Sequence, residues 1–555
     1  MSPGDREKSA AVALGLALVA TAVTLALHHP VLPLARTHVP VSAFHPGHVF
    51  IFDHIARMVT GDAPWSLVTE RLAYPVGAEL RPIAWVPALL TLPFRPLLGP
   101  IGAYNAVVWM SPALSALAAW GLIRRLTGAG PLAAAGAALP FALSPFALGC
   151  LASGQTAKVQ LWALALPLWA ASVALERPRL GLPLLAGTVV AASFTSPSLT
   201  LQLPFALGLV ALGGLSLGWR GAARGAGALG VAALSMLPAY LFFRAVTGGH
   251  DPDGPVQALQ PALRPTLMED IGNAIARLRA TLLPFPELPV EPTDTAHLTV
   301  LPWPILVVAL LALPWSRKGR WIGLGLAIAG FLLASGEYLW WAEGFVEVGG
   351  HLLGLPALYL GRLGYPLSDS GMYYRAIATT TLGLSILLAA AAARVGGRRG
   401  ALLAVLVGLA ATAEAVRVTA PLWPRAPYAP IPAALAARMA EDPVPGAVLD
   451  LPMEHHGNHA EGYMLAAVQH GRATIGAPLL LRPEDLPHLA ALERDVVAAL
   501  EAEDPDAALR ALGFRYVVWH PIGWDGGPGE ADVAAALGPG TLEEGVRWWR
   551  VEGGE

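Results

Sequence analysis

Four side chains that can carry a charge or exchange a proton lie within ten residues of one another: His48, Asp53, His54 and Arg57. Apolar residues recur at helical spacing over 49–59, which predicts a short amphipathic helix with those four side chains on its polar side. In such a helix Asp53 and Arg57 are four positions apart on one face, so they can form an ion pair. Asp53 is therefore either half of a structural ion pair or a carboxylate kept for its chemistry.

A second group of potential ligands lies near the C-terminus, in the segment DLPMEHHGNHAE. His455 and His459 are four positions apart, and Asp450 precedes both; imidazole and carboxylate are good ligands for divalent metals. Gly457 and Asn458 stand between the two histidines and favour a loop, in which helical register is lost. The sequence favours a polar loop over a metal site here. It leaves a divalent metal as a candidate cofactor, with none certain.

The elements that must position these groups follow from the composition. The chain has 555 residues, of which 55% are hydrophobic and 14% charged, and its mean hydropathy is +0.54. Soluble domains use about 25% charged residues, so this chain cannot cover a globular surface of its own size and is predicted to be a polytopic membrane protein. The net charge of −3 gives no basic field for nucleic acid. Cys150 is the one cysteine, which excludes an intrachain disulfide framework and a cysteine-rich zinc site.

Apolar runs predict an α-helical protein with about 11 transmembrane helices, because a bilayer core needs roughly 20 apolar residues per helix. The runs fall near 10–27, 102–123, 131–149, 158–175, 180–195, 199–217, 226–246, 298–314, 321–341, 375–393 and 401–420. The stretch 83–98 is also apolar, but it carries several prolines and Arg95, and we expect it to lie in the interface. The loops on one side then hold 14 Lys and Arg in 43 residues, and those on the other side hold ten in 173. Cytoplasmic loops are enriched in Lys and Arg, so the N-terminus is predicted inside and the C-terminus outside.

This topology divides the chain into two predicted domains. Residues 1–420 form the transmembrane domain, with long outer loops at 28–100, 247–297 and 342–374. Residues 421–555 have the charge density of a soluble protein and alternate strand signals (GAVLDLP, FRYVVWHP, VRWWRVE) with helical ones. They predict a small extracytoplasmic α/β domain. The proline-rich PLWPRAPYAPIP at 421–432 is the expected linker.

Several short motifs resemble a known family when they are taken in order along this topology. They are YPVGAEL in the first outer loop, then GPIGAYN and RRLTG, DSGMYYRAIATTTLG at 369–383, and GAVLDLP and LGFRYVVWHP in the tail. Their order is similar to that of bacterial GT-C-type integral membrane glycosyltransferases, relatives of the protein O-mannosyltransferases and aminoarabinose transferases. The resemblance implies transfer of a sugar from a polyprenyl-phosphate donor to a glycan, lipid or protein acceptor on the outer face of the membrane.

The resemblance also implies roles for residues. Enzymes of this type use an outer-loop Asp or Glu as general base, which makes Asp53 the first candidate. Asp62 in TGDAPW is the second, although GDAP also reads as an ordinary turn. His48 stands where an acidic residue would often be expected, and His54 and Arg57 complete the candidate residues of this loop.

The phosphate of a lipid-linked donor needs a cation at headgroup depth. Lys158 in SGQTAKVQ and Arg375 in MYYRAIA each begin a predicted span at the outer rim. An Arg can hold phosphate oxygens in a bidentate way, and a Lys acts as a point charge. The alternative for both is snorkelling to the interface, with Tyr373 and Tyr374 as an aromatic belt.

Two other functions stay open. A transporter or flippase of lipid-linked intermediates should carry polar or ionisable residues inside its spans, and Gln202 and Glu414 are the main candidates. A non-catalytic GT-C-like scaffold in envelope polysaccharide assembly is the third reading. We expect the protein in the bacterial inner (plasma) membrane, with membrane lipids and a lipid-linked sugar as partners and no nucleic acid.

Overall fold

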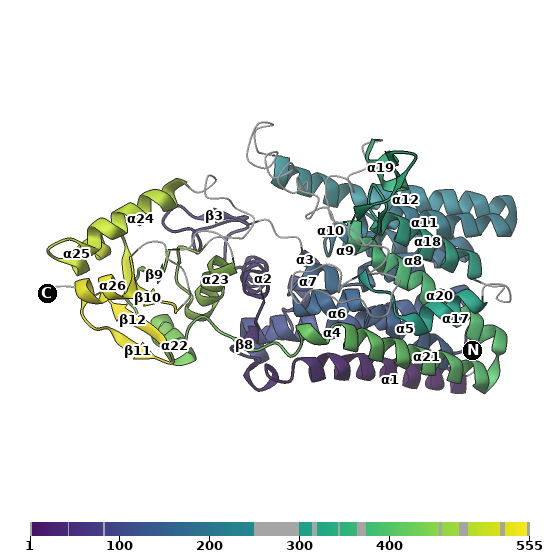
Figure 1. Ribbon diagram of the computed structural model, residues 1–555, viewed down its shortest axis with the longest axis horizontal. Coiled ribbons are helices and arrows are strands. Elements are labelled where there is room, and N and C mark those ends of the chain that lie inside the picture. The colour runs from purple at the N-terminus through teal and green to yellow at the C-terminus, as the bar shows by residue number, and fades with distance from the viewer. Residues whose placement is uncertain are drawn as a thin grey trace. The chain divides into compact units, whose positions relative to one another are not determined.

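The computed structural model describes residues 3–42, 44–80, 84–248, 299–312, 319–341, 344–362, 373–453, 458–476, 487–521 and 528–551. The chain divides into two compact units (Figure 1). The helical unit comprises Met1–His29 and Val108–Pro424, and the mixed unit comprises Pro30–Val107 and Arg425–Glu555. The division at Pro424 falls inside the proline-rich stretch expected as a linker. Most of the predicted outer loop 28–100 belongs to the mixed unit, together with the C-terminal residues.

Long apolar helices make the protein a multi-pass membrane protein. Among the described residues six helices are long and apolar enough to cross a membrane: Asp5–Leu27, Arg95–Thr127, Thr156–Glu176, Gly218–Phe242, Tyr373–Val395 and Gly397–Val418. They correspond to α1 (Pro3–Leu27), α4 (Arg95–Thr127), α7 (Thr156–Val159) with α8 (Trp162–Glu176), α12 (Gly218–Gly248), η3 (Tyr373–Ala376) with α20 (Ile377–Val395), and α21 (Gly397–Val418). A seventh is obtained if α5 (Pro131–Ala142) and α6 (Pro145–Ala152), bent by 47°, count as one span.

The other predicted spans coincide with shorter helices. These are α9 (Pro178–Ser193), α10 (Pro197–Thr200) with α11 (Leu203–Gly213) and η2 (Gly214–Leu217), α17 (Trp303–Ala312), and α18 (Arg320–Ala334). The count of about 11 spans and the orientation of the termini therefore stay predictions. The described part of 83–98 is divided between α3 (Trp85–Leu90) and the start of α4, so no continuous helix of spanning length covers it.

The other two predicted outer loops are described in part. In 342–374 the structure shows α19 (Pro356–Arg362) and the hairpin of β6 (Glu347–Val348) with β7 (His351–Leu352). It also shows β5 (Gly344–Phe345), which pairs with β4 (Trp340–Trp341) just before this loop. In 247–297 it describes only the end of α12.

Small residues set the separation of the membrane helices. α5 packs against α21, and α18 packs against α20. A Cβ on Gly408 would collide with the carbonyl oxygen of Gly136, and one on Gly383 would collide with the backbone nitrogen of Ala327. Neither position has room for a larger side chain. The high glycine content of the sequence thus serves close helix approach.

The mixed unit is built on a four-stranded sheet in the order β11–β12–β10–β9. The strands are β9 (Ala447–Leu451), β10 (Phe514–Trp519), β11 (Thr541–Glu543) and β12 (Val546–Arg550), and only the β9–β10 pair is parallel. The three strand signals of the tail are thereby confirmed. Helix α22 (Ala433–Glu441) packs its apolar side, including Leu435 and Met439, into one core with Val448 and Val518 of the sheet.

Further helices complete the mixed unit: α23 (Asn458–His470), α24 (Pro487–Leu500), α25 (Pro505–Ala511) and α26 (Glu530–Leu537). Residues 30–107 join them in two ways. The strand β1 (Val39–Pro40) pairs with β8 (Pro427–Tyr428), and α2 (His45–Thr60) lies beside α23 (Figure 1). A small hairpin, β2 (Val68–Thr69) with β3 (Ala78–Glu79), follows α2. The predicted loop helix is therefore packed on the C-terminal part of the chain.

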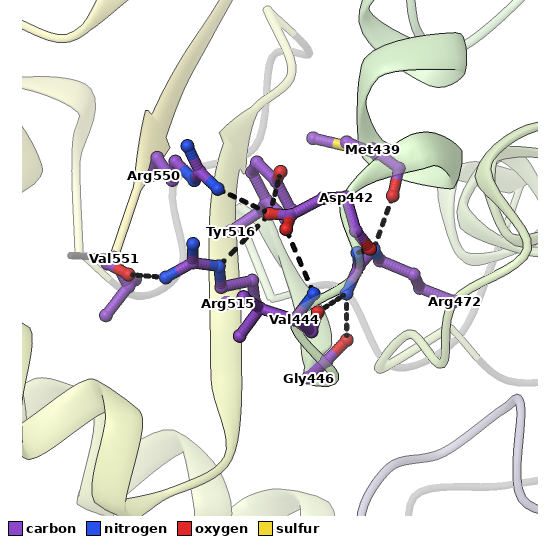
Figure 2. A network of polar contacts seen from close by, with 9 residues as sticks. All are labelled: Met439, Asp442, Val444, Gly446, Arg472, Arg515, Tyr516, Arg550 and Val551. Atoms are coloured by element: carbon purple, nitrogen blue, oxygen red, sulfur yellow. Dashed lines mark hydrogen bonds and ion pairs between the residues drawn. The ribbon is translucent and has the colours of Figure 1, made fainter. Parts of the chain in front are cut away.

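Asp442 fastens the loop between α22 and β9 to the sheet (Figure 2). Its Oδ2 accepts hydrogen bonds from the Tyr516 hydroxyl at 2.6 Å, from Arg515 Nε at 3.2 Å and from Arg550 Nη2 at 3.0 Å. Its Oδ1 accepts one from the backbone N–H of Val444 at 3.0 Å. The hydrogen bond from Tyr516, followed by those from Val444 and Arg515, lowers the pKa of the Asp442 carboxyl. One carboxylate thus joins three segments of the unit.

Replacing Asp442 by alanine is expected to lower the free energy of unfolding of the mixed unit by about 2–4 kcal/mol, because its charged donors lose a shared acceptor. Urea unfolding of the detergent-purified chain measures the change. The control is Asp495→Ala, which removes an exposed carboxylate from α24 and should leave the transition in place. Equal shifts for both variants would contradict the role given to Asp442.

Candidate active site

Helix α2 carries the residues that the sequence singles out in the first outer loop. It covers the predicted 49–59 and extends from His45 to Thr60, with Pro46 in its first turn and Gly61 at φ 85° as its C-cap. The predicted polar side is largely covered, because α3 and α23 pack on the helix; His48 and Arg57 stay half-buried. Asp53 is 4% exposed and His54 is 3% exposed.

Asp53 is held by two arginines. Its Oδ2 lies 2.9 Å from Arg71 Nη1, and its Oδ1 lies 2.6 Å from Arg95 Nη2. Arg71 also donates to the carbonyl oxygen of Ala467 on α23 at 2.6 Å. The expected partner from helical spacing, Arg57, is not the one that the structure gives; Arg57 reaches the carbonyl oxygen of Asp62 at 3.5 Å instead. Asp53 thus joins α2 to two later segments instead of pairing within its own helix.

This pairing decides the basicity of Asp53. Burial alone would raise its pKa, but the charges and hydrogen bonds of Arg71 and Arg95 outweigh burial and lower the pKa below its usual range. With both oxygens engaged, Asp53 is a weak base in this arrangement. The two guanidinium charges beside the carboxylate also repel a divalent cation, so Asp53 does not fit a metal ligand here.

The remaining loop candidates have local roles. His48 Nδ1 lies 2.7 Å from the carbonyl oxygen of Phe44, and His54 Nε2 lies 2.9 Å from that of Ser66. Burial lowers the pKa of His54, which keeps it neutral near pH 7. Asp62 is exposed and accepts a hydrogen bond from the Thr60 hydroxyl at 2.6 Å, in the turn that its sequence indicates.

Glu461 on α23 is a carboxyl that the sequence reading left unassigned. It is 6% exposed, and its Oε2 accepts the backbone N–H of Gly47 at 3.3 Å. A Cβ on Gly47 would lie 2.7 Å from Glu461 Cδ, so a larger residue at position 47 would displace this carboxyl from its place against α2. Burial raises the pKa of Glu461 to about 8, and the single N–H of Gly47 opposes the shift only in part. The sequence signal for this group was one acidic residue on an otherwise apolar helix face.

The raised pKa makes the stability of the mixed unit depend on pH. Below pH 4.5, the usual value, Glu461 is protonated in both the folded and the unfolded chain; between 4.5 and about 8 the unfolded chain releases the proton and the folded chain keeps it. Stability is therefore expected to fall by a few kcal/mol across that window and to level off above it. The measurement is the unfolding midpoint from pH 5 to 9 in wild type and Glu461→Gln, with exposed Glu501→Gln as control. If the unfolding midpoints of wild type and Glu461→Gln changed with pH in parallel, the raised pKa of Glu461 would be refuted.

Of the three candidate metal ligands in the tail, the structure describes the side chain of Asp450 alone. Asp450 is buried, where Oδ1 lies 2.8 Å from His520 Nε2 and Oδ2 accepts the Thr474 hydroxyl. His455 lies outside the described residues, and His459 is described only as a backbone position at the start of α23. Among described residues no group of three or more His, Cys, Asp or Glu could hold a metal ion. Asp450 serves the interior of the mixed unit.

The helical unit brings Lys158 and Arg375 together. They lie in the first turns of the candidate spans Thr156–Glu176 and Tyr373–Val395, and each is close enough for its charge to act on the other. The Lys158 ammonium donates to Gln155 Oε1. The Arg375 guanidinium lies 5.9 Å from the centroid of the Tyr374 ring.

This cationic cluster, defined as Gln155, Lys158, Tyr374 and Arg375, lies where the helices are broken. The short α6, α7 and η3 leave gaps in the regular helical hydrogen bonding, which inside a membrane unit is tolerated where the backbone is buried in protein or lines a cavity. Two cations close to one another can together hold an anion placed between them. The cluster can bind a phosphate through the Arg fork and the Lys point charge.

Comparison with known proteins gives the fold. No family model matches the sequence, and no curated protein matches it. The cryo-EM structure of the arabinofuranosyltransferase AftD from Mycobacteria is 15% identical at a TM-score of 0.54, and the match covers 97% of this chain and 40% of that one. The oligosaccharyltransferase of Archaeoglobus fulgidus, AglB, is 13% identical at a TM-score of 0.47, with 91% and 69% covered; one of its structures holds an inhibitory peptide and a dolichol-phosphate, and another holds Zn and sulfate.

The similarity to AftD extends over nearly the whole of this chain, although the chain spans less than half the length of AftD. The chain therefore has the fold of a GT-C-type membrane glycosyltransferase, which confirms at the level of fold the resemblance found in the sequence.

Proposed function

We propose that the chain is a membrane glycosyltransferase that moves a sugar from a polyprenyl-phosphate donor to a glycan, lipid or protein acceptor on the outer face of the membrane. The observation that carries the proposal is the cationic cluster, in which Lys158 and Arg375 come together in a membrane unit. The fold shared with an arabinofuranosyltransferase supports the same class of reaction and favours a pentose or hexose donor.

In this proposal the cationic cluster binds the phosphate of the donor. Lys158 and Arg375 stabilise the negative charge that grows on that phosphate as the bond between it and the sugar breaks. The acceptor hydroxyl attacks the sugar carbon, its proton passes to a general base, and polyprenyl phosphate leaves. The proposed reaction thus uses cations at the leaving phosphate and one general base.

Asp53 is the first candidate for that base, with Asp62 second. The ion pairs of Asp53 mean that an arginine must release one of its oxygens before it can take a proton. Asp62 is exposed and would need no such release. His48, His54 and Arg57 are candidates for holding the acceptor, and no step is assigned to a metal.

We further propose the bacterial inner membrane as the location, with the N-terminus inside and residues 421–555 outside. The charge difference between the two sets of predicted loops supports this orientation. The partners are then a lipid-linked sugar, an acceptor of the envelope and the surrounding lipids.

A non-catalytic scaffold is the second candidate, favoured by one observation. Both oxygens of Asp53 are paired, as expected of a structural residue. A carrier is less favoured, because its two interior polar candidates have structural partners. Glu414 accepts the backbone N–H of Trp303 at 2.9 Å, and Gln202 bonds to Thr379 and to the Arg375 carbonyl oxygen.

The test is a transfer assay in membranes with polyprenyl-phosphate arabinofuranose and polyprenyl-phosphate hexoses as donors, read out as released polyprenyl phosphate. Wild type is compared with Asp53→Asn and Asp62→Asn. We expect donor consumption by wild type, and loss of transfer in a variant that still unfolds like wild type identifies the base. Wild type that binds donors without consuming them, with native cell envelope extract supplied as acceptor, would contradict the enzyme and leave the scaffold.

A further inference from the structure

We infer that Gln202 is a positioning residue for the cationic cluster: it holds the segment that carries Arg375 and thereby sets the affinity for phosphate. The inference rests on the proposed function, since it concerns the same phosphate site. Gln202 does not belong to the cluster and makes no bond to its side chains among the described contacts. It acts through the backbone of Arg375.

Both the nitrogen and the oxygen of the Gln202 side-chain amide form hydrogen bonds. Its Nε2 donates to the carbonyl oxygen of Arg375 at 3.1 Å and to that of Ser198 at 3.3 Å, while its Oε1 accepts the Thr379 hydroxyl at 2.6 Å. Gln202 is 1% exposed and Thr379 is 2% exposed. Gln202 lies at the N-cap of α11, directly after the short α10. One buried side chain therefore ties the α10–α11 break to the break before α20.

The segment that Gln202 holds is short. Arg375 lies in η3, a single 3-10 turn whose backbone passes close to α18, since a Cβ on Gly330 would lie 2.9 Å from the carbonyl oxygen of Ala376. The contact at Gly330 holds one side of this turn, and the bond from Gln202 adds a second point of attachment. A turn held at both points presents its arginine in a fixed place beside Lys158. Cations placed before the ligand arrives bind it with less loss of conformational freedom.

The chemistry of glutamine suits this task. It donates to a carbonyl and accepts from a hydroxyl while remaining neutral. A glutamate of the same length could accept from Thr379, but it could not donate to the carbonyl of Arg375 when ionised. A leucine of similar volume would do neither. These differences give variants that change the attachment of the turn without touching the cationic side chains.

The experiment measures binding of farnesyl phosphate and of farnesol to the detergent-purified full chain. The two probes share the isoprenoid and differ in the phosphate. Wild type is compared with Gln202→Leu and Thr379→Val. The matched control is Thr381→Val, because that buried hydroxyl on the same helix donates to the carbonyl of Ile377 within its own helix. We expect Gln202→Leu and Thr379→Val to lower the affinity for farnesyl phosphate by about three- to tenfold. This is the effect expected from losing one or two hydrogen bonds. Farnesol binding and the Thr381→Val control should stay unchanged.

The outcomes separate this inference from the proposed function. If wild type binds farnesyl phosphate no better than farnesol, the phosphate site fails and the inference fails with it. If wild type discriminates and both variants discriminate equally well, the site stands and the positioning role is wrong. Equal weakening of both probes shows a general packing defect and also overturns the role. Thr379→Val keeps the test informative should Gln202→Leu fail to fold.

Discussion

Replacing Lys158 by methionine and Arg375 by glutamine in one chain is expected to abolish sugar transfer from polyprenyl-phosphate donors. We expect each single variant to lower kcat/KM by about 100- to 1,000-fold, the range for removing one group that stabilises developing charge. The physical reason is the low dielectric around the broken helices. A cation there interacts with a phosphate far more strongly than it would in water.

The measurement is the rate of polyprenyl phosphate release in proteoliposomes at several donor concentrations. Arg224→Gln is the matched control, because Arg224 is an exposed arginine of the same unit that donates to the carbonyl oxygen of Leu175. It should transfer sugar at the wild-type rate. Transfer that survives in the double variant would show that both cations only snorkel, as the sequence alone allowed.

The second large effect is expected at Asp53. Replacing it by asparagine or leucine leaves Arg71 and Arg95 in a buried site without their shared counter-ion. Breaking a buried ion pair from one side typically costs about 3–5 kcal/mol. We therefore expect Asp53→Leu to destabilise the mixed unit by that amount and Asp53→Asn by somewhat less.

A triple variant separates the two readings of Asp53. Replacing Asp53 by leucine together with Arg71→Met and Arg95→Met removes all three charges, and most of the lost stability should return, because hydrophobic residues of similar volume often replace buried ion pairs without loss. The measurement is urea unfolding of the purified chain. If Asp53→Asn unfolds like wild type and loses only sugar transfer, Asp53 is the base and its ion pairs contribute little to stability.

The ion pairs also have a pH signature of their own. Because the folded pKa of Asp53 lies below the ordinary 3.8, the stability that they contribute is fully present above that value. It is lost as the pH falls through the lower folded value. The stability lost with the Asp53 ion pairs is therefore lost at acid pH. The stability lost because of Glu461 is lost between pH 4.5 and about 8.

Local patterns in the sequence correctly predicted the elements whose cause is local. The apolar runs predicted the membrane helices because burying a backbone in lipid requires about 20 apolar residues in a row. Alternation and β-branched content located β9, β10 and β12, and helical spacing located α2. The turn at Asp62 followed from its residue types. The count of spans was less secure, because prolines and small residues allow an apolar run to fold as a shorter or broken helix.

The partners of the functional side chains were decided by tertiary structure. Asp53 meets Arg71 and Arg95, which lie 18 and 42 positions away, rather than Arg57 on its own helix. Glu461 accepts a hydrogen bond from the backbone of Gly47, which lies 414 positions away. Gln202, at first a candidate for transport, reaches the Arg375 carbonyl across 173 positions. Periodicity indicates which face of a helix or strand is apolar. The group that a carboxylate or an amide meets depends instead on which distant segment packs against it. A single sequence does not show which distant segments lie together.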